Sequence, residues 1–243
     1  MPHNDAVPAD ERQSNNPRWA LAEHVGDVVR RRHPADVLAI GVHGSLAHGD
    51  DTRGSDVNVV VVTYRPGAGP RPITRRVDGV LVELTVVGRD DYLQAARTLS
   101  ASWPLTADRY VTTRPLHDPR GWLPALRDTH LGRLAEARPA EFTALAREAW
   151  CRAASAHAHA ARLAEWYDTD AALLLLGESR LRAAMVVGLL SRTYFRTSAD
   201  AVKRTGLAGT DLASLGATLA AQAEELAGRG RPVDGPLATF LDG

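Results

Sequence analysis

The stretch that decides the fold reads Gly41-Val42-His43-Gly44-Ser45-Leu46-Ala47-His48-Gly49-Asp50-Asp51-Thr52-Arg53-Gly54-Ser55-Asp56-Val57-Asn58-Val59-Val60-Val61-Val62. The apolar run Val37–Ile40 precedes it, so a strand enters a glycine-rich turn and a valine strand leaves it. Strand side chains alternate between faces, so Asp56 and Asn58 point to the same side. The Gly44-Ser45 turn offers backbone N–H groups to a phosphate, and oxygen ligands two residues apart suit a divalent cation. The stretch therefore predicts a site for a phosphate and a metal together.

Length, charge and cysteine content bound the class of protein. The chain has 243 residues, enough for one large domain or two smaller ones with real cores. Lys+Arg equals Asp+Glu at 29 each, so no electrostatic footprint for nucleic acid or an anionic membrane is expected. The single cysteine, Cys151, excludes an intramolecular disulfide and is typical of a reducing compartment, so a cytoplasmic location is expected. No apolar run reaches the roughly 20 residues that span a bilayer.

The elements expected along the chain fall into two groups. A polar N-terminal segment, residues 1–16, is expected to be a mobile tail. An α/β domain is predicted over residues 17–130 and a helical domain over residues 131–243. The α/β part comprises a helix over 17–32, strands over 37–40 and 57–63, a hairpin over 75–87 with an Asp-Gly turn, a helix over 90–101 and a strand-like run over 110–113. Helices are then expected over 122–136, 139–167, 170–195, 199–206 and 210–228.

Glu83 is a second feature with chemical meaning. The run Val80–Val87 is predicted to be a buried strand, and Glu83 lies in its middle. A carboxylate inside an apolar strand is costly unless it is paired or bound to a cation. Glu83 therefore joins Asp56 as a candidate cation ligand.

Several short motifs occur in a characteristic order, namely Gly41–Leu46, Ser55–Asn58, Val80–Glu83, Trp103–Thr106 and Thr197–Ala199. In this order they resemble the kanamycin nucleotidyltransferase family of the nucleotidyltransferase superfamily, over about residues 37 to 210. The resemblance implies an α+β fold, with a mixed sheet flanked by helices and followed by a C-terminal helical bundle. It also implies transfer of AMP from ATP to an aminoglycoside hydroxyl with Mg²⁺, by a homodimer whose active site lies at the subunit interface.

The resemblance assigns roles to individual positions. Gly44 and Ser45 would hold the triphosphate. Asp56 and Glu83 would be metal ligands, and Asn58 occupies the second metal-ligand position. Glu148 matches an acid that faces the active site of the partner subunit.

Five positions depart from the family pattern. Asn58 replaces a carboxylate, which removes one negative charge and should lower divalent affinity. Arg152 stands where the family has its general base, and arginine cannot accept a proton at neutral pH. Ala156 replaces a lysine, His48 an arginine and Ala101 a serine. Together the changes indicate either a variant mechanism or loss of nucleotidyl transfer.

Simpler interpretations stay open for Glu148, Arg152 and His43. Glu148 and Arg152 are spaced i, i+4, as in an ordinary surface ion pair worth about 0.3–0.5 kcal/mol. His43 stands where the family has an aromatic residue, so core packing is an alternative to catalysis.

Three functions follow from these observations. The first is adenylylation, from ATP, of a hydroxyl on a small, aminoglycoside-like molecule, in antibiotic resistance or biosynthesis. The second is a repurposed enzyme with a decayed nucleotide site, performing acid/base or cyclisation chemistry on a biosynthetic intermediate with Asp56, Glu83, His43, His48 and Arg152. The third is a non-catalytic binding protein. The arginines of residues 64–79 would repel a cationic substrate if they face the site, which favours an acceptor less cationic than kanamycin.

Overall fold

The structure, a computed structural model, describes residues 16–235, and their contacts divide them into two compact units. The first unit holds the described residues up to Thr98 and Asp108–Ala135. The second holds Leu99–Ala107 and the described residues from Glu136 onward. The expected mobile tail, residues 1–16, lies outside the described residues apart from Asn16, which caps the first described helix by accepting a hydrogen bond from the Arg18 N–H.

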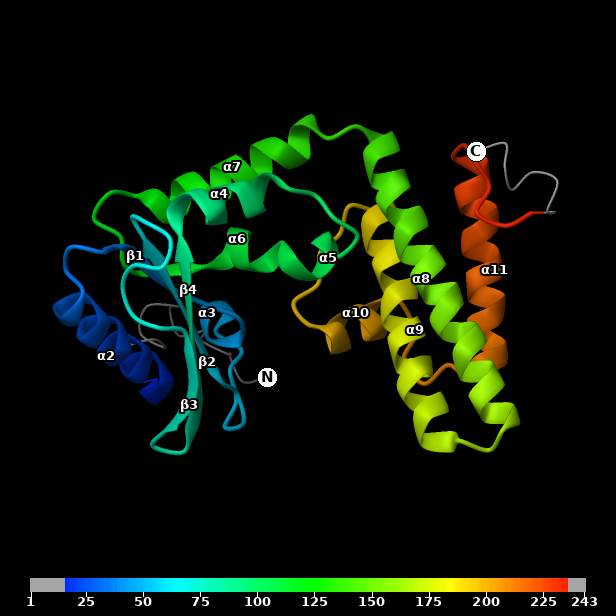
Figure 1. Cartoon of the computed structure of the whole chain (residues 1–243), viewed down its shortest axis with the longest axis horizontal. Helices are drawn as coiled ribbons and strands as arrows, with labels where there is room; N and C mark the ends of the chain where they lie inside the picture. The colour runs from blue at the N-terminus through cyan, green and yellow to red at the C-terminus, as the bar shows by residue number, and fades with distance from the viewer. Residues whose placement is uncertain (1–15, 236–243) are drawn as a thin grey trace, which may run out of the picture. The chain divides into compact units, whose positions relative to one another are not determined.

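A five-stranded mixed sheet forms the centre of the first unit (Figure 1). The strand order is β3-β4-β2-β1-β5; β2 and β4 pair in parallel and the other neighbours are antiparallel. The strands are β1 (Val37–His43), β2 (Val57–Thr63), β3 (Ile73–Val77), β4 (Val80–Gly88) and β5 (Arg114–His117). The expected fold class, a mixed sheet flanked by helices and followed by a helical part, is confirmed.

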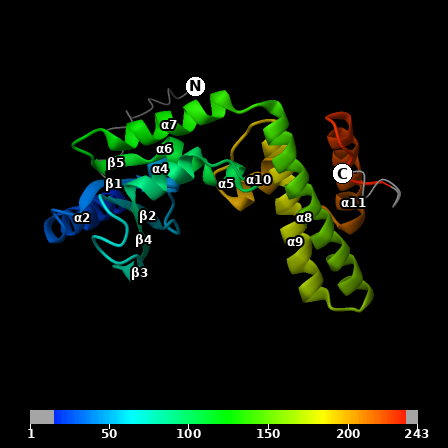
Figure 2. The ribbon, with the colours of Figure 1, turned by 45° about the horizontal axis from the view of Figure 1, so that its top comes forward.

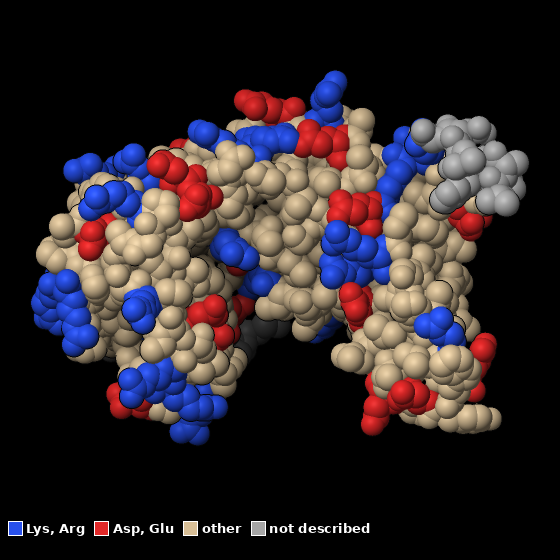
Figure 3. Space-filling model, viewed as in Figure 1, with Lys and Arg blue, Asp and Glu red and all other residues tan. Residues whose placement is uncertain are grey.

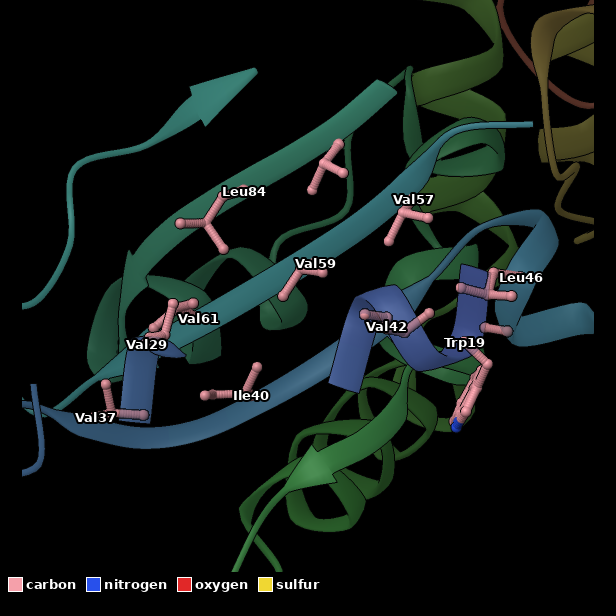
Figure 4. Close-up of a cluster of buried hydrophobic side chains, with 13 residues drawn as sticks. Trp19, Val29, Val37, Ile40, Val42, Leu46, Val57, Val59, Val61 and Leu84 are labelled. Atoms are coloured by element: carbon pink, nitrogen blue, oxygen red, sulfur yellow. The ribbon is translucent and has the colours of Figure 1, made fainter. Parts of the chain in front are cut away.

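Helices cover both faces of this sheet (Figure 2). On one face, α2 (Pro17–Arg32) and α3 (Ser45–His48) pack on the odd-numbered residues of β2, which Figure 4 shows beside Ile40 and Val42 of β1. On the other face, α4 (Arg89–Arg97), α6 (Asp108–Thr112) and α7 (Trp122–Glu136) cover Val60 and Val62. The alternation of strand side chains thus divides the core into two layers.

The β3–β4 hairpin follows from its turn. Asp78 and Gly79 have φ angles of 49° and 81°, and two positive φ angles are what a two-residue type I′ turn requires. The expected Asp-Gly hairpin is confirmed, and its turn fixes the register of β3 on β4.

One strand prediction was wrong. Residues 110–113 were expected to form a strand, but Tyr110 to Thr112 belong to α6, and the strand β5 begins only at Arg114. The Thr112 hydroxyl donates to the Asp108 carbonyl at 2.8 Å, as in a helical turn. The Tyr110 ring packs against Tyr92 and His130, so core contacts override the strand preference of its residue types.

The second unit is built of helices. They are α5 (Trp103–Thr106), α8 (Pro139–Glu165), α9 (Thr169–Leu190), α10 (Ser198–Arg204) and α11 (Leu212–Gly228). Buried alanines along α8 allow close approach of α9, and the Ser179 hydroxyl donates to the Ala153 carbonyl at 2.8 Å across this contact. The Trp150 indole N–H donates to the Leu219 carbonyl of α11 at 2.8 Å.

Among the described residues, no helix combines the length and the apolar character that a membrane span requires. Figure 3 shows basic and acidic side chains interspersed over the face in view.

His130 gives a test of the second core layer. Its side chain is fully buried, and Nδ1 donates to the Ala96 carbonyl at 2.7 Å. Replacing His130 with leucine leaves that carbonyl without this donor, so we expect a loss of about 1–3 kcal/mol in the free energy of unfolding at pH 7.5, measured by urea denaturation.

The same residue predicts a pH dependence. Burial lowers the pKa of His130, although the hydrogen bond to Ala96 opposes this effect. Because the unfolded chain binds the proton more readily, this stability is present above the ordinary histidine pKa of about 6.5 and is lost as pH falls below it. His130→Leu should reduce the loss of stability on acidification, whereas His24→Gln, on the exposed surface of α2, should leave it unchanged. An unaltered pH dependence in His130→Leu would contradict the assignment.

Candidate functional site

Asp56 and Asn58 lie at the start of β2. Asp56 immediately precedes the strand and Asn58 is its second residue, with the fully buried Val57 between them. Val57 packs toward α2, so Asn58 faces the opposite side of the sheet, the side that carries Val60 and Val62. The valines anchor the strand and thereby fix the direction of the Asn58 side chain.

Strand pairing places residues of the neighbouring strands beside Asn58. Asn58 is paired with Glu83 of β4 on one side and with His43 of β1 on the other, and Glu83 is paired with Thr74 of β3. Laterally paired residues present their side chains on the same face. We call His43, Asn58, Glu83 and Thr74 the polar row. It crosses four strands. It lies on the same face of the sheet as Val60 and Val62, which α4, α6 and α7 cover.

The prediction that Glu83 is buried was wrong. Glu83 is exposed, whereas its neighbours Val82 and Leu84 are buried against the α2 layer. The strand β4 lies next to the edge strand β3, most of which is exposed, so apolar residues bury only one face at this point. The Glu83 carboxylate therefore carries little cost of desolvation and needs no internal partner.

The Gly44-Ser45 turn lies directly beside the polar row. Gly44 has φ 75° and ψ −156°, a conformation essentially restricted to glycine, and Ser45 begins α3 immediately after it. A Cβ atom added at Gly44 would lie 3.1 Å from Nδ2 of Asn58. The turn that was expected to bind phosphate thus lies next to Asn58, and a side chain at position 44 would press on the Asn58 amide.

This contact predicts the effect of a side chain at position 44. Gly44→Ala should lower the free energy of unfolding by about 1–3 kcal/mol, because alanine strains this backbone and its Cβ crowds Asn58. Urea denaturation measures the loss. Gly54→Ala is the matched control, since nothing lies within 4 Å of an added Cβ there and its φ is not positive. Equal stability of the two variants would contradict the strained turn.

The surroundings of His43 lower the pKa of its imidazole. Burial lowers its pKa, and the positive charge of Arg109 lowers it further, while Asp108 and Asp56 oppose both effects. The ring therefore lies within electrostatic reach of three charged residues. Strand pairing places His43 on the same face of the sheet as Asn58.

His48 contacts an aspartate that sequence reasoning missed. The His48 ring nitrogen Nε2 lies 3.0 and 3.2 Å from the two carboxylate oxygens of Asp108 on α6. The side chains are only 12% and 8% exposed, so the pair is largely shielded from water. The one available signal was the charged pair Asp108-Arg109, one residue after the Trp-Pro-Leu-Thr segment, within a run that was expected to lead into a strand.

The remaining expected site residues belong to the second unit. Glu148 and Arg152 form an ion pair at 2.6 Å on α8, with both side chains about half exposed. This is the simpler of the two interpretations that their spacing allowed. Ala156 is buried in the alanine contact of α8, and Ala101 is buried in the segment before α5.

Asp56, Asn58 and Glu83 are side chains of the types that a hard divalent cation takes as ligands. Asp56, Asn58 and Glu83 carry two carboxylates and one amide oxygen, and none of these side chains makes a hydrogen bond or ion pair with another described residue. Magnesium takes one or two carboxylates and completes its shell with water and phosphate oxygens. Counting His, Cys, Asp and Glu alone, no three side chains of the described residues gather in a metal-binding group. The set therefore includes the Asn58 amide and has only two negative charges.

The two arginines of β3, Arg75 and Arg76, lie on opposite faces of the sheet. Arg76 is paired with Leu81, two residues from Glu83, and so lies on the polar-row face of the sheet. Arg75 is paired with the buried Val82 and lies on the other face. Arg76 thus shares the face of the candidate site, and its guanidinium donates to the Gly79 carbonyl in the hairpin turn at 3.2 Å.

Comparison with known proteins gives distant likenesses among solved structures. No family model matches the chain, and no curated protein matches it. Among solved structures that are similar to it is the crystal structure of a nucleotidyltransferase-like protein from Exiguobacterium sibiricum. The identity is 13%, the alignment covers 85% of this chain and 75% of that one, and the TM-score is 0.45.

Proposed function

We propose that this chain is a nucleotidyltransferase-like enzyme that transfers AMP from ATP to a hydroxyl group of a small molecule. The observation that carries the proposal is the register that sets Asn58 beside Glu83, with Gly44 in contact with Asn58. A turn suited to phosphate and a set of uncommitted oxygen donors are thereby adjacent. In-line transfer of a nucleotidyl group depends on this combination.

Asp56, Asn58 and Glu83 are the residues that would hold Mg²⁺. When bound, the cation would neutralise triphosphate oxygens and stabilise the charge that develops on the leaving pyrophosphate. Two carboxylates in place of three lower the affinity for the free ion, so we expect Mg²⁺ to enter together with the nucleotide.

The chain's own groups bind and orient the substrates. The Ser45 hydroxyl and the backbone N–H groups of the turn can donate to phosphate oxygens. Arg76 on the polar-row face and Arg109 near His43 add positive charge around the site. We therefore propose an acceptor that is less cationic than kanamycin, or one with an acidic group of its own.

Calorimetric titration of the full chain with ATP and Mg²⁺ tests the proposal. We expect heat of binding that disappears when EDTA removes the cation, and release of pyrophosphate once a hydroxyl acceptor is present. A titration without heat at millimolar ATP and Mg²⁺ would reject the proposal.

A repurposed enzyme is the second candidate, favoured by the ion pair of Glu148 with Arg152. That pair occupies the two helix positions at which the resembling family has an acid and a general base. This candidate predicts conversion of a biosynthetic intermediate without ATP and in the presence of EDTA. Retention of ATP and Mg²⁺ dependence would exclude it.

We also propose that the chain forms a homodimer. The supporting observation is a group of large apolar side chains exposed around the α8–α9 turn, namely Trp166, Tyr167, Leu173 and Leu174. Light scattering during size-exclusion chromatography measures the mass directly. A mass of 26.1 kDa across micromolar concentrations would contradict a dimer.

A further inference from the structure

The His48–Asp108 pair joins two short helices that are 60 residues apart in the chain. An ionised carboxylate can only accept hydrogen bonds, so Nε2 of His48 carries the hydrogen that it donates to Asp108. In the neutral ring the other nitrogen, Nδ1, is then a bare acceptor. The contact therefore fixes both the tautomer and the orientation of the imidazole.

The pair lies beside the candidate site. His48 follows Ser45 by three residues in α3, so both side chains project from the same side of one helical turn. Asp108 also acts electrostatically on His43, the polar-row residue paired with Asn58. Asp108 thus contacts His48 and also acts on His43, while Arg109 on α6 and Asp56 before β2 are the other charged groups that act on His43.

Other candidates for a proton acceptor are committed elsewhere. Asp56 and Glu83 are the proposed cation ligands. Glu148 is paired with Arg152, whose guanidinium cannot accept a proton. His43 has no carboxylate within hydrogen-bonding distance among the described residues, so nothing fixes its tautomer in the way that Asp108 fixes that of His48.

We propose that His48 is the general base of the reaction and that Asp108 is its positioning residue. The inference rests on the proposed function. The acceptor hydroxyl gives its proton to Nδ1 of His48 while its oxygen forms a bond to the α-phosphorus of ATP. The bond from that phosphorus to the oxygen bridging to the β-phosphate breaks, and pyrophosphate leaves with the electron pair. The imidazolium ion then releases its proton to water.

His48→Gln separates this role from a structural one. The glutamine amide can still donate to Asp108, but it has no nitrogen that accepts a proton at neutral pH. Water serves as the simplest hydroxyl acceptor, so the assay measures AMP and pyrophosphate formed from ATP and Mg²⁺ across pH 5 to 9. We expect kcat of His48→Gln to fall about 10²–10⁴-fold with KM for ATP unchanged, and the acidic limb of the pH profile to disappear.

His33→Gln is the matched control. His33 also lies beside an aspartate, Asp36, at 4.0 Å, but it follows the last residue of α2 and is about one third exposed. This variant should keep the rate and the pH profile of the unaltered protein. Circular dichroism and calorimetric titration with ATP and Mg²⁺ verify that each variant folds and binds.

The outcomes separate the base from the proposed function. If the unaltered protein forms AMP and His48→Gln keeps the rate and the acidic limb, His48 is not the base and the proposed function stands. A rise in KM alone would assign His48 to phosphate binding and overturn proton transfer. If the unaltered protein binds ATP and Mg²⁺ but forms no AMP, activation of a hydroxyl by His48 is overturned, and the proposed function is decided separately by the calorimetric titration. Should His48→Gln fail to fold, Asp108→Ala decides, because loss of the carboxylate releases the orientation of the ring and should lower kcat with KM for ATP unchanged, and an unchanged kcat overturns the proposal.

Discussion

Replacing Asp56 with asparagine is expected to lower the rate of pyrophosphate release about a thousandfold while the chain stays folded. Asp56 supplies one of only two negative charges among the proposed cation ligands. A cation and its ligands contribute several kcal/mol of charge stabilisation in the transition state, and about 1.4 kcal/mol corresponds to a factor of ten in rate. Asp56 makes no hydrogen bond or ion pair with another described residue, so its replacement breaks no structural contact.

The assay combines rate and stability. Pyrophosphate release at saturating ATP and Mg²⁺ reports the rate, and urea denaturation reports the free energy of unfolding. Asp90→Asn is the control, because Asp90 is exposed on α4 and contacts only its neighbour Arg89 among the described residues, at 3.3 Å. Turnover of Asp56→Asn within about threefold of that control would remove Asp56 from the site.

Replacing Asn58 with aspartate is expected to raise the affinity for Mg²⁺ about 10- to 100-fold. The side chain keeps its shape, but the cluster regains a third negative charge beside Glu83. A unit charge a few ångströms from a cation is worth a few kcal/mol near a protein surface, part of which is offset by repulsion between the carboxylates. Calorimetric titration with Mg²⁺ alone measures the change without any assay of activity.

The same variant should be less stable in the absence of the cation. Like charges that face each other across paired strands cost about 0.2–1 kcal/mol, so Asn58→Asp should lower the free energy of unfolding in EDTA. Saturating Mg²⁺ should restore it. Asn58→Ser, which adds no charge, controls for loss of the amide and should show neither effect. If Asn58→Asp binds Mg²⁺ no better than the unaltered chain, the three side chains do not converge on one cation.

Local signals in the sequence were sufficient for most of the elements. The helices over 17–32 and 122–136 and the strand over 57–63 have the predicted bounds. Caps, apolar periodicity and turn residues lie within a few positions of each of these elements, so a single chain reveals them. The prediction for residues 110–113 was wrong because contacts with residues distant in the chain determine the structure there. A ring from α4 and another from α7 hold Tyr110 in the helix.

The site was only partly predictable for the same reason. Asp56 and Asn58 could be placed on one face from the period of a strand, but the pairing of Asn58 with Glu83 depends on strand order. The exposure of Glu83 follows from its place beside an edge strand, whereas its apolar neighbours suggested burial on both faces. Asp108 was missed because its partner His48 is 60 residues away, and no local pattern connects them.

The alternation along β2 has a consequence for how this protein can evolve. Val57, Val59 and Val61 anchor the strand on one face, while residue 58 serves the polar row on the other. Selection for a stable fold and selection for chemistry thus act on different residues of the same strand. A lineage can exchange a carboxylate for an amide at position 58, and later reverse the exchange, without repacking the core. Among descendants of a common ancestor, positions 57, 59 and 61 should stay apolar, while the residue at position 58 should differ between proteins that catalyse different reactions.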